Sequence, residues 1–187
     1  MTLKLRPWQD SAINKAINWL AVKKKDKRFL INAAPGAGKT ICAAVLAKNL
    51  IDAGEIERVI IIAPRREVVK QWKDEFKIVT NRAMLIETGG SEDLGLDICS
   101  TWNSVENNLS LFKKVCSEFK TLIICDEHHH AAINAVWGTS AVNSFENAKY
   151  VKFGIIFVKF SNFEYIFFIN ILCSLIVIPN IFLYKIT

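Results

Sequence analysis

The chain has 187 residues, of which 51% are hydrophobic and 22% are charged, and its formal net charge is +6. This length supports one domain with a substantial core and is short for two, and the mixed charges up to about residue 151 exclude intrinsic disorder in that part. The surplus of Lys and Arg favours a polyanionic partner such as nucleic acid or anionic lipid, although a soluble enzyme with a chance basic excess explains it about as well.

In chain order, the apolar patterns predict helices alternating with strands. The expected elements are a helix at Arg6–Lys25, a strand at Phe29–Ala33, a helix at Thr40–Ala53, a strand at Arg58–Ala63, a helix at Arg65–Lys77, strands at Ala83–Ile86 and Leu96–Ser100, helices at Trp102–Asn108 and Leu111–Phe119, and a strand at Thr121–Cys125. The β-branched, unbroken runs at 58–63 and 121–125 are typical of strands buried on both faces. The alternation predicts an α/β fold with a mostly parallel central sheet flanked by helices.

The cysteines exclude two classes of small protein. The sequence has five, at Cys42, Cys99, Cys116, Cys125 and Cys173. Their number is odd and no two form a C-x-x-C pair, so neither a disulfide framework nor a zinc ribbon follows. Several lie in apolar runs, as small core residues do. Because Met1–Trp8 also lacks the apolar core of a signal peptide, we expect a protein of the reducing cytoplasm.

The segment Ala33–Thr40, Ala-Ala-Pro-Gly-Ala-Gly-Lys-Thr, has the pattern of a phosphate-binding (Walker A) loop. It follows an expected strand and opens an expected helix, which is the context that the pattern requires. Glycines allow the backbone N–H groups to approach phosphate oxygens, and the helix start adds partial positive charge. Lys39 is expected to reach the β- and γ-phosphates of ATP, and the Thr40 hydroxyl to bind Mg²⁺. The alternative is a glycine-rich turn before an ordinary helix.

Two carboxylates follow the strand at 121–125. Ligands bind at the carboxyl ends of strands in parallel sheets, so Asp126 is expected to hold Mg²⁺ and Glu127 to orient and deprotonate the attacking water. Lys39, Asp126 and Glu127 are therefore the expected catalytic residues. The adjacent His128, His129 and His130 could suggest a metal site, but three consecutive side chains converge poorly on one ion.

With both motifs placed, the chain resembles the first RecA-like domain of a superfamily 2 helicase of the DEAD/DEAH type, related to the helicase subunits of type III restriction enzymes. The resemblance covers about residues 3–150. It is carried by five segments in the expected order, which are Leu5–Gln9, Ala34–Thr40 (motif I), Ala63–Trp72 (motif Ia), Ser100–Ser104 (motif Ib) and Asp126–His129 (motif II).

The resemblance implies roles for further residues. Arg6 and Gln9 would contact the adenine, with Gln9 at its edge, and the nucleotide would also be bound by Pro35, Gly36, Ala37, Gly38, Lys39, Thr40 and Ile41. Arg65, Arg66 and Thr101 would face a nucleic-acid backbone, for which DNA is favoured over RNA from the restriction-subunit likeness. His129 would couple the two sites. The structural alternatives are a solvent-facing Gln9 and an ordinary solvated helix start at Arg65 and Arg66.

The composition changes after about residue 151. Lys152–Thr187 is dominated by Phe and Ile, and no motif III follows the expected strand near Ala148–Val151. The sequence therefore predicts an ATP-binding domain at 1–151 and an apolar tail at 152–187 that is not its native continuation, as after a frameshift. The rival interpretation is a membrane anchor, which Tyr165–Tyr184 is barely long enough to form and which we do not favour. A strand that completes the sheet at Ile155–Phe160 fits either case.

Two functions remain open for the chain. It is either the ATP-binding half of an ATP-dependent DNA helicase or translocase, or a module that binds ATP and weakly binds DNA without productive turnover. The resemblance implies that a second RecA-like domain, in the same protein or supplied by another subunit, provides arginine fingers. Such a residue is worth about 10³–10⁵ in rate.

Overall fold

The structure is a computed structural model that describes residues 4–23, 28–34, 36–87, 95–126, 145, 151–158 and 182–185, the last two ranges as backbone. Helices and strands alternate along the chain, as the sequence predicts. The helical elements are α1 (Pro7–Ile17), η1 (Asn18–Val22), α2 (Lys39–Asp52), α3 (Arg66–Thr80), α4 (Trp102–Asn107) and α5 (Leu109–Glu118). The strands are β1 (Arg28–Asn32), β2 (Arg58–Ala63), β3 (Met84–Glu87), β4 (Asp97–Thr101), β5 (Thr121–Cys125), β6 (Val151–Val158) and β7 (Phe182–Lys185).

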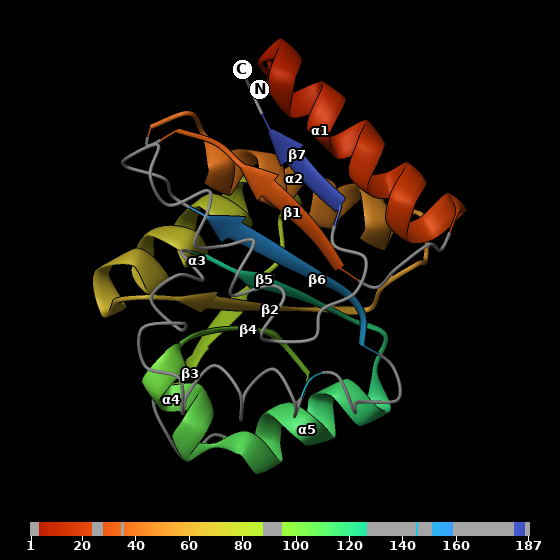
Figure 1. Ribbon diagram of the computed structural model, residues 1–187. Coiled ribbons are helices and arrows are strands. Elements are labelled where there is room, and N and C mark those ends of the chain that lie inside the picture. Colours follow the sequence, from red (N-terminus) through yellow and green to blue (C-terminus); the bar gives the residue numbers. More distant parts are fainter. Residues whose placement is uncertain are drawn as a thin grey trace, which may run out of the picture.

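The strands form one sheet whose order is β3-β4-β2-β5-β6-β1-β7 (Figure 1). Every neighbouring pair is parallel. All the described strands therefore present their carboxyl ends at the same edge of the sheet. The predicted α/β fold with a parallel central sheet flanked by helices is confirmed.

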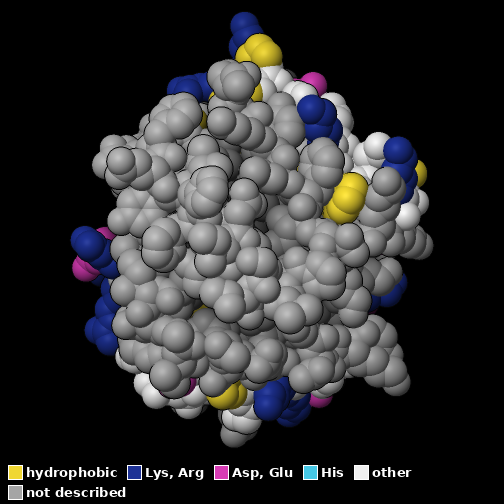
Figure 2. Space-filling model, viewed as in Figure 1, with side chains coloured by type: hydrophobic (Ala, Val, Ile, Leu, Met, Phe, Trp, Pro, Cys, Tyr) yellow, Lys and Arg dark blue, Asp and Glu magenta, His cyan; other side chains and the backbone are white. Residues whose placement is uncertain are grey.

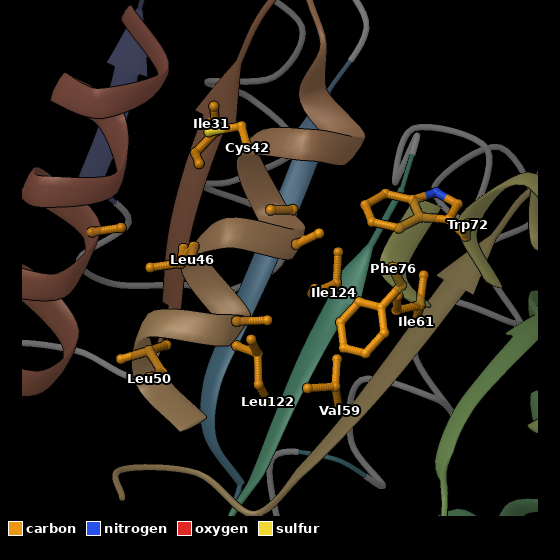
Figure 3. Close-up of a cluster of buried hydrophobic side chains, with 14 of the residues drawn as sticks. Ile31, Cys42, Leu46, Leu50, Val59, Ile61, Trp72, Phe76, Leu122 and Ile124 are labelled. Carbon is orange, nitrogen blue, oxygen red and sulfur yellow. The ribbon is translucent and has the colours of Figure 1, made fainter. Parts of the chain in front are cut away.

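Both faces of the sheet are covered, and the strands alternate between two cores. On one face, Val59 and Ile61 of β2 pack with residues of α1, α2 and α3, and Trp72 and Phe76 of α3 lie over this face (Figure 3). On the other face, Ile60 of β2 packs with residues of α4 and α5. Burial on both faces explains why β2 and β5 read as unbroken apolar runs rather than as alternating patterns.

Two helices end differently from the prediction. The first was expected to continue to Lys25, but regular α-helix ends at Ile17 and η1 follows as a single π-helical turn. The third extends beyond the expected Lys77 to Thr80, where Asn81 closes it in a left-handed conformation with φ of 58°. Asn tolerates this conformation better than other residues with a side chain, so it can end a helix where glycine is absent.

Strand β6 begins at the predicted domain boundary and continues into the predicted tail. It pairs with β5 on one side and with β1 on the other, so residues 151–158 occupy the interior of the sheet. This strand overlaps the stretch at Ile155–Phe160 that the sequence suggested could complete the sheet. Strand β7 lies at the sheet edge beside β1. The rest of 159–187 lies outside the described residues, and within the described residues no helix is long and apolar enough to cross a membrane.

Four of the cysteines, Cys42, Cys99, Cys116 and Cys125, are buried and free, as expected for core residues. Burial raises the pKa of the Cys42 thiol and of the Cys116 thiol to about 12 each. These thiols therefore stay protonated and unreactive at neutral pH. Cys173 lies outside the described residues.

Candidate nucleotide-binding site

The two predicted nucleotide-binding segments follow β1 and β5, which are separated by β6. Val158 of β6 is paired with Asn32 at the end of β1, and Ile156 of β6 is paired with Cys125 at the end of β5. Along β6, the end of β1 therefore lies two residues beyond the end of β5, at the same edge of the sheet. Neighbouring strands are about 4.8 Å apart, so these two ends are separated by about 10 Å across the sheet.

The loop after β1 turns through two glycines. Gly36 has φ of 71° and Gly38 has φ of 88°, and both values lie in the left-handed region that side chains disfavour. At Gly38 the space is also closed, because a Cβ there would stand 2.8 Å from Nε2 of Gln9. The positive φ therefore favours glycine at 38, and any side chain there would also have to displace the end of the Gln9 side chain.

Two side chains from the start of α1 hold this loop. Gln9 Nε2 donates a hydrogen bond to the carbonyl oxygen of Gly38 at 2.8 Å, and Arg6 Nη1 donates to that of Ala37 at 3.2 Å. The Gln9 Oε1 atom in turn accepts from the Arg6 backbone N–H at 2.7 Å. Gln9 is only 4% exposed, so the solvent-facing alternative is wrong. Its contact with adenine stays a prediction, and here both ends of its amide are bound to backbone groups.

The start of α2 suits a phosphate group. Its first backbone hydrogen bond runs from Cys42 N–H to the Gly38 carbonyl at 3.1 Å. The N–H groups in the turn before Cys42 have no acceptor within the helix and carry partial positive charge at its start. Lys39 lies in this turn and its Nζ donates to the Ala33 carbonyl at 3.4 Å, which keeps the ammonium group over the loop. Thr40 and Ile41 follow in the same turn, partly buried.

Asp126 directly follows β5 and is 9% exposed. Its backbone N–H donates to the Ile62 carbonyl at 2.8 Å, which extends the β2–β5 pairing by one residue. Its carboxylate Oδ2 accepts a hydrogen bond from Nε1 of Trp72 at 2.8 Å. The oxygens of this nearly buried carboxylate at the strand end are the hard ligands that Mg²⁺ prefers.

Several predicted residues cannot be placed. Pro35, Glu127 and His129 lie outside the described residues, as do His128 and His130. Among the residues that are described, no group of three or more His, Cys, Asp or Glu side chains could hold a metal ion. The roles given to Pro35, Glu127 and His129 stay predictions.

The residues expected to contact nucleic acid lie at the same edge of the sheet. Thr101 of β4 is paired with Ala63, the last residue of β2, and Arg65 and Arg66 follow Ala63 after one proline. Both arginines are exposed. The Thr101 hydroxyl caps α4 by accepting from the Ser104 N–H at 3.3 Å, so this residue has a structural task as well.

Figure 2 shows where Lys and Arg side chains lie on one face of the molecule. The Lys and Arg side chains coloured in it lie apart from one another around the rim rather than in one patch. On this face the coloured Lys and Arg side chains therefore form no continuous basic patch.

The sequence did not indicate that Trp72 contacts Asp126. Trp72 is 1% and Trp102 4% exposed, so both are core residues. A buried indole N–H usually has a hydrogen-bond acceptor, and a carboxylate at the end of a buried strand can accept this bond. The two residues are far apart in sequence, however, and only the β2–β5 pairing brings α3 over Asp126.

A parallel sheet with a phosphate-loop pattern after one strand and a carboxylate after another defines a RecA-like P-loop domain of the kind found in superfamily 2 helicases. The family model described as type III restriction enzyme, res subunit, matches residues 2–156. The chain belongs to this family. The match ends inside β6.

Curated relatives are much longer than this chain. An uncharacterized protein of Mycobacterium leprae is 27% identical over 154 residues, which are 77% of this chain and 24% of that protein. The endonuclease subunit of the type I restriction enzyme EcoAI of Escherichia coli is 30% identical over 138 residues, which are 71% of this chain and 17% of that subunit. The chain thus spans about a quarter or less of these relatives.

Solved structures share the fold. The UvsW helicase from bacteriophage T4 has a TM-score of 0.63 and 18% identity, over 83% of this chain and 52% of that one. The SWI2/SNF2 ATPase core of Sulfolobus solfataricus, solved in complex with double-stranded DNA, has a TM-score of 0.65 and 20% identity, over 84% of this chain and 32% of that one. The chain is therefore a helicase-type ATPase domain related to restriction-enzyme res subunits.

Proposed function

We propose that this chain is the ATP-binding domain of an ATP-dependent DNA helicase or translocase, in which ATP hydrolysis drives movement on DNA. The observation that carries the proposal is the placement of the loop at 33–40 and of Asp126 at the carboxyl ends of β1 and β5, with β6 between them. That spacing leaves room for a triphosphate and its metal ion between the two segments.

The residues fit ATP and Mg²⁺ in distinct ways. The glycine turn and the start of α2 receive the phosphates, Lys39 neutralises the β- and γ-phosphates, and Thr40 and Asp126 hold Mg²⁺. Bound Mg²⁺ supplies charge stabilisation at the phosphoryl group. Glu127 orients the water molecule and accepts its proton. Gln9 and Arg6, which hold the loop from α1, link the adenine end to the phosphate end of the site.

DNA is proposed to lie against Arg65, Arg66 and Thr101. Two exposed arginines at the start of α3 and a hydroxyl at the start of α4 are donors suited to phosphate oxygens, which give affinity without sequence readout. The solved SWI2/SNF2 core holds double-stranded DNA, and the EcoAI relative is a subunit of a restriction enzyme, so DNA is favoured over RNA.

A second candidate is a module that binds ATP and weakly binds DNA without productive turnover. It concerns the isolated chain, in which the family match covers a single domain at residues 2–156. An arginine finger from a second RecA-like domain accelerates hydrolysis by about 10³–10⁵. The isolated chain should therefore bind ATP and turn it over slowly.

Steady-state ATP hydrolysis by the purified chain, measured with and without DNA, separates the two candidates. We expect turnover close to that of a Lys39→Ala preparation, which reports contaminating ATPases, in both conditions. DNA-stimulated turnover well above this control would show that the chain hydrolyses ATP without a second domain, or with one supplied by a second copy. Restoration of turnover by an added second RecA-like domain would support the helicase proposal over the binding module.

A further inference from the structure

We propose that Trp72 is a positioning residue for the magnesium-binding carboxylate of Asp126, an inference that rests on the proposed function. The indole Nε1 of Trp72 donates a hydrogen bond of 2.8 Å to Oδ2 of Asp126, and this contact joins α3 to the end of β5. Trp72 is not among the ATP-site residues that the sequence predicts.

The contact is built into the core rather than formed at the surface. Trp72 is 1% exposed, and its neighbours on the same helix, Val69 and Phe76, are 1% and 0% exposed. The indole belongs to the same buried cluster as Ile61 and Ile124, and in Figure 3 it lies farther along the sheet than Phe76. A two-ring side chain that is almost fully buried in a packed cluster has little freedom to rotate, so its N–H keeps one direction.

The carboxylate is also held in its own place. The backbone N–H of Asp126 is bound to the Ile62 carbonyl at 2.8 Å, so its Cα is fixed to the sheet. With the backbone fixed, the hydrogen bond to Oδ2 sets the rotation of the carboxylate group and thereby the direction of Oδ1.

Fixing that rotation matters for a metal ligand. Mg²⁺ requires near-ideal octahedral geometry, and partners that orient its carboxylate ligands change metal affinity by about 10- to 100-fold when they are removed. The Trp72 indole has the features of such a partner, since it bonds to one carboxylate oxygen and is itself held by packing. Losing it should weaken Mg²⁺ binding while leaving the phosphate loop intact, because the hydrogen bond is made to Asp126 after β5 and not to the loop after β1.

The test compares two buried tryptophans. Trp72→Phe keeps an aromatic ring and removes the N–H, and Trp102→Phe makes the same change in α4 on the opposite face of the sheet. A fluorescent, non-hydrolysable ATP analogue is bound first without metal and then during a Mg²⁺ titration. We expect Trp72→Phe to raise the half-saturating Mg²⁺ concentration by about 10- to 100-fold at unchanged metal-free affinity, and Trp102→Phe to change neither. An equal response of the two variants would overturn the proposal.

A spectroscopic arm keeps the proposal falsifiable if Trp72→Phe does not fold. The chain has five tryptophans, so a proton–nitrogen correlation spectrum of the whole protein shows few indole N–H signals. We expect one of them to shift when Asp126→Asn weakens the acceptor, and the same one to shift when Mg²⁺ is added with the analogue. If the two changes shift different indole N–H signals, or if either shifts none, the proposal is contradicted. Wild-type protein that binds the analogue without any effect of Mg²⁺ contradicts the proposed function instead, and the Asp126→Asn shift then reports on the contact alone.

Discussion

The side chain of Gln9 reaches from α1 to the carbonyl oxygen of Gly38, and this contact fills the space where a residue other than glycine would place its Cβ. The phosphate loop is thus held from outside by a helix that precedes it in sequence. The effect of this contact on nucleotide affinity can be measured by replacing Gly38.

Gly38→Ala should lose nucleotide binding, because the left-handed φ of 88° and the 2.8 Å approach to Gln9 both oppose a methyl group. The matched control is Gly54→Ala, where φ is 69° and a Cβ meets nothing within 4 Å. That variant should lose about 1–2 kcal/mol of stability from backbone strain and bind the nucleotide normally. Titration with a fluorescent ATP analogue and urea unfolding check both. Comparable nucleotide affinity in the two variants would show that the loop tolerates displacement of Gln9.

Replacing either residue of the ion pair Arg82–Asp97 should destabilise the fold, and the loss should be larger when Arg82 is replaced. Asp97 is nearly inaccessible and accepts from Arg82 Nε at 2.7 Å and from Val59 N–H at 2.8 Å, whereas Arg82 is partly exposed. Arg82→Met leaves a buried carboxylate without its cation and should cost about 3–5 kcal/mol. Asp97→Asn keeps an acceptor for Val59 and leaves the cation near water, so it should cost less.

Urea unfolding measures this order. The control is Lys48→Met, which breaks an exposed ion pair with Asp52 and should change stability by less than about 1 kcal/mol. An equal loss for Arg82→Met and Lys48→Met would mean that burial of Asp97 has no energetic consequence.

The Cys116 thiol should make the fold less stable in alkali. Its pKa is raised by burial to about 12 from 9.0, with a hydrogen bond to Thr121 acting in the opposite direction. Between these pH values the folded state keeps the proton and the unfolded state releases it, so stability falls as pH rises, by at most about 1.4 kcal/mol per pH unit.

Cys116→Ala should flatten the dependence of unfolding free energy on pH above 9, while Ser117→Ala, an exposed neighbour, should not. The slope is the informative quantity, since a cavity shifts stability equally at every pH. An unchanged slope in Cys116→Ala would place the thiol in contact with water.

DNA binding should depend on the start of α3. Arg65→Ala and Arg66→Ala each remove an exposed cation beside Thr101, and each lost phosphate contact should reduce the slope of log affinity against log salt by about 0.9. Lys77→Ala, an exposed residue in the last turn of the same helix, is the control. Fluorescence anisotropy with duplex DNA at several salt concentrations gives the slopes. If all three variants lose the same amount, the binding is diffuse and the start of α3 has no special role.

Much of the fold could be predicted because its signals are local. The β-branched runs predicted the observed bounds of β2 and β5, and the predicted end of the helix at Ala53 lies one residue beyond the observed end of α2 at Asp52. The π-helical turn after Ile17 could not be predicted, because apolar periodicity does not distinguish it from α-helix. Neither could the position of β6, since strand order depends on pairing between distant segments.

The candidate site likewise has a part that could be predicted from the sequence and a part that could not. Its phosphate loop is a contiguous pattern that the sequence displays, whereas Gln9–Gly38 and Trp72–Asp126 join residues of different elements. The prediction that 152–187 is not a native continuation stays a prediction. Sequencing the locus checks it, because an intact motif III in another reading frame downstream would support it and its absence would contradict it.

The most direct test of the account is Mg²⁺-dependent binding of a fluorescent ATP analogue to the wild-type chain, to Lys39→Ala and to Lys48→Ala. Lys39 lies over the phosphate loop and Lys48 lies on the same helix, exposed and paired with Asp52. We predict that wild type and Lys48→Ala bind the analogue alike and that Lys39→Ala shows no detectable binding. Unchanged affinity in Lys39→Ala would contradict the assignment of the loop at 33–40 as the ATP site.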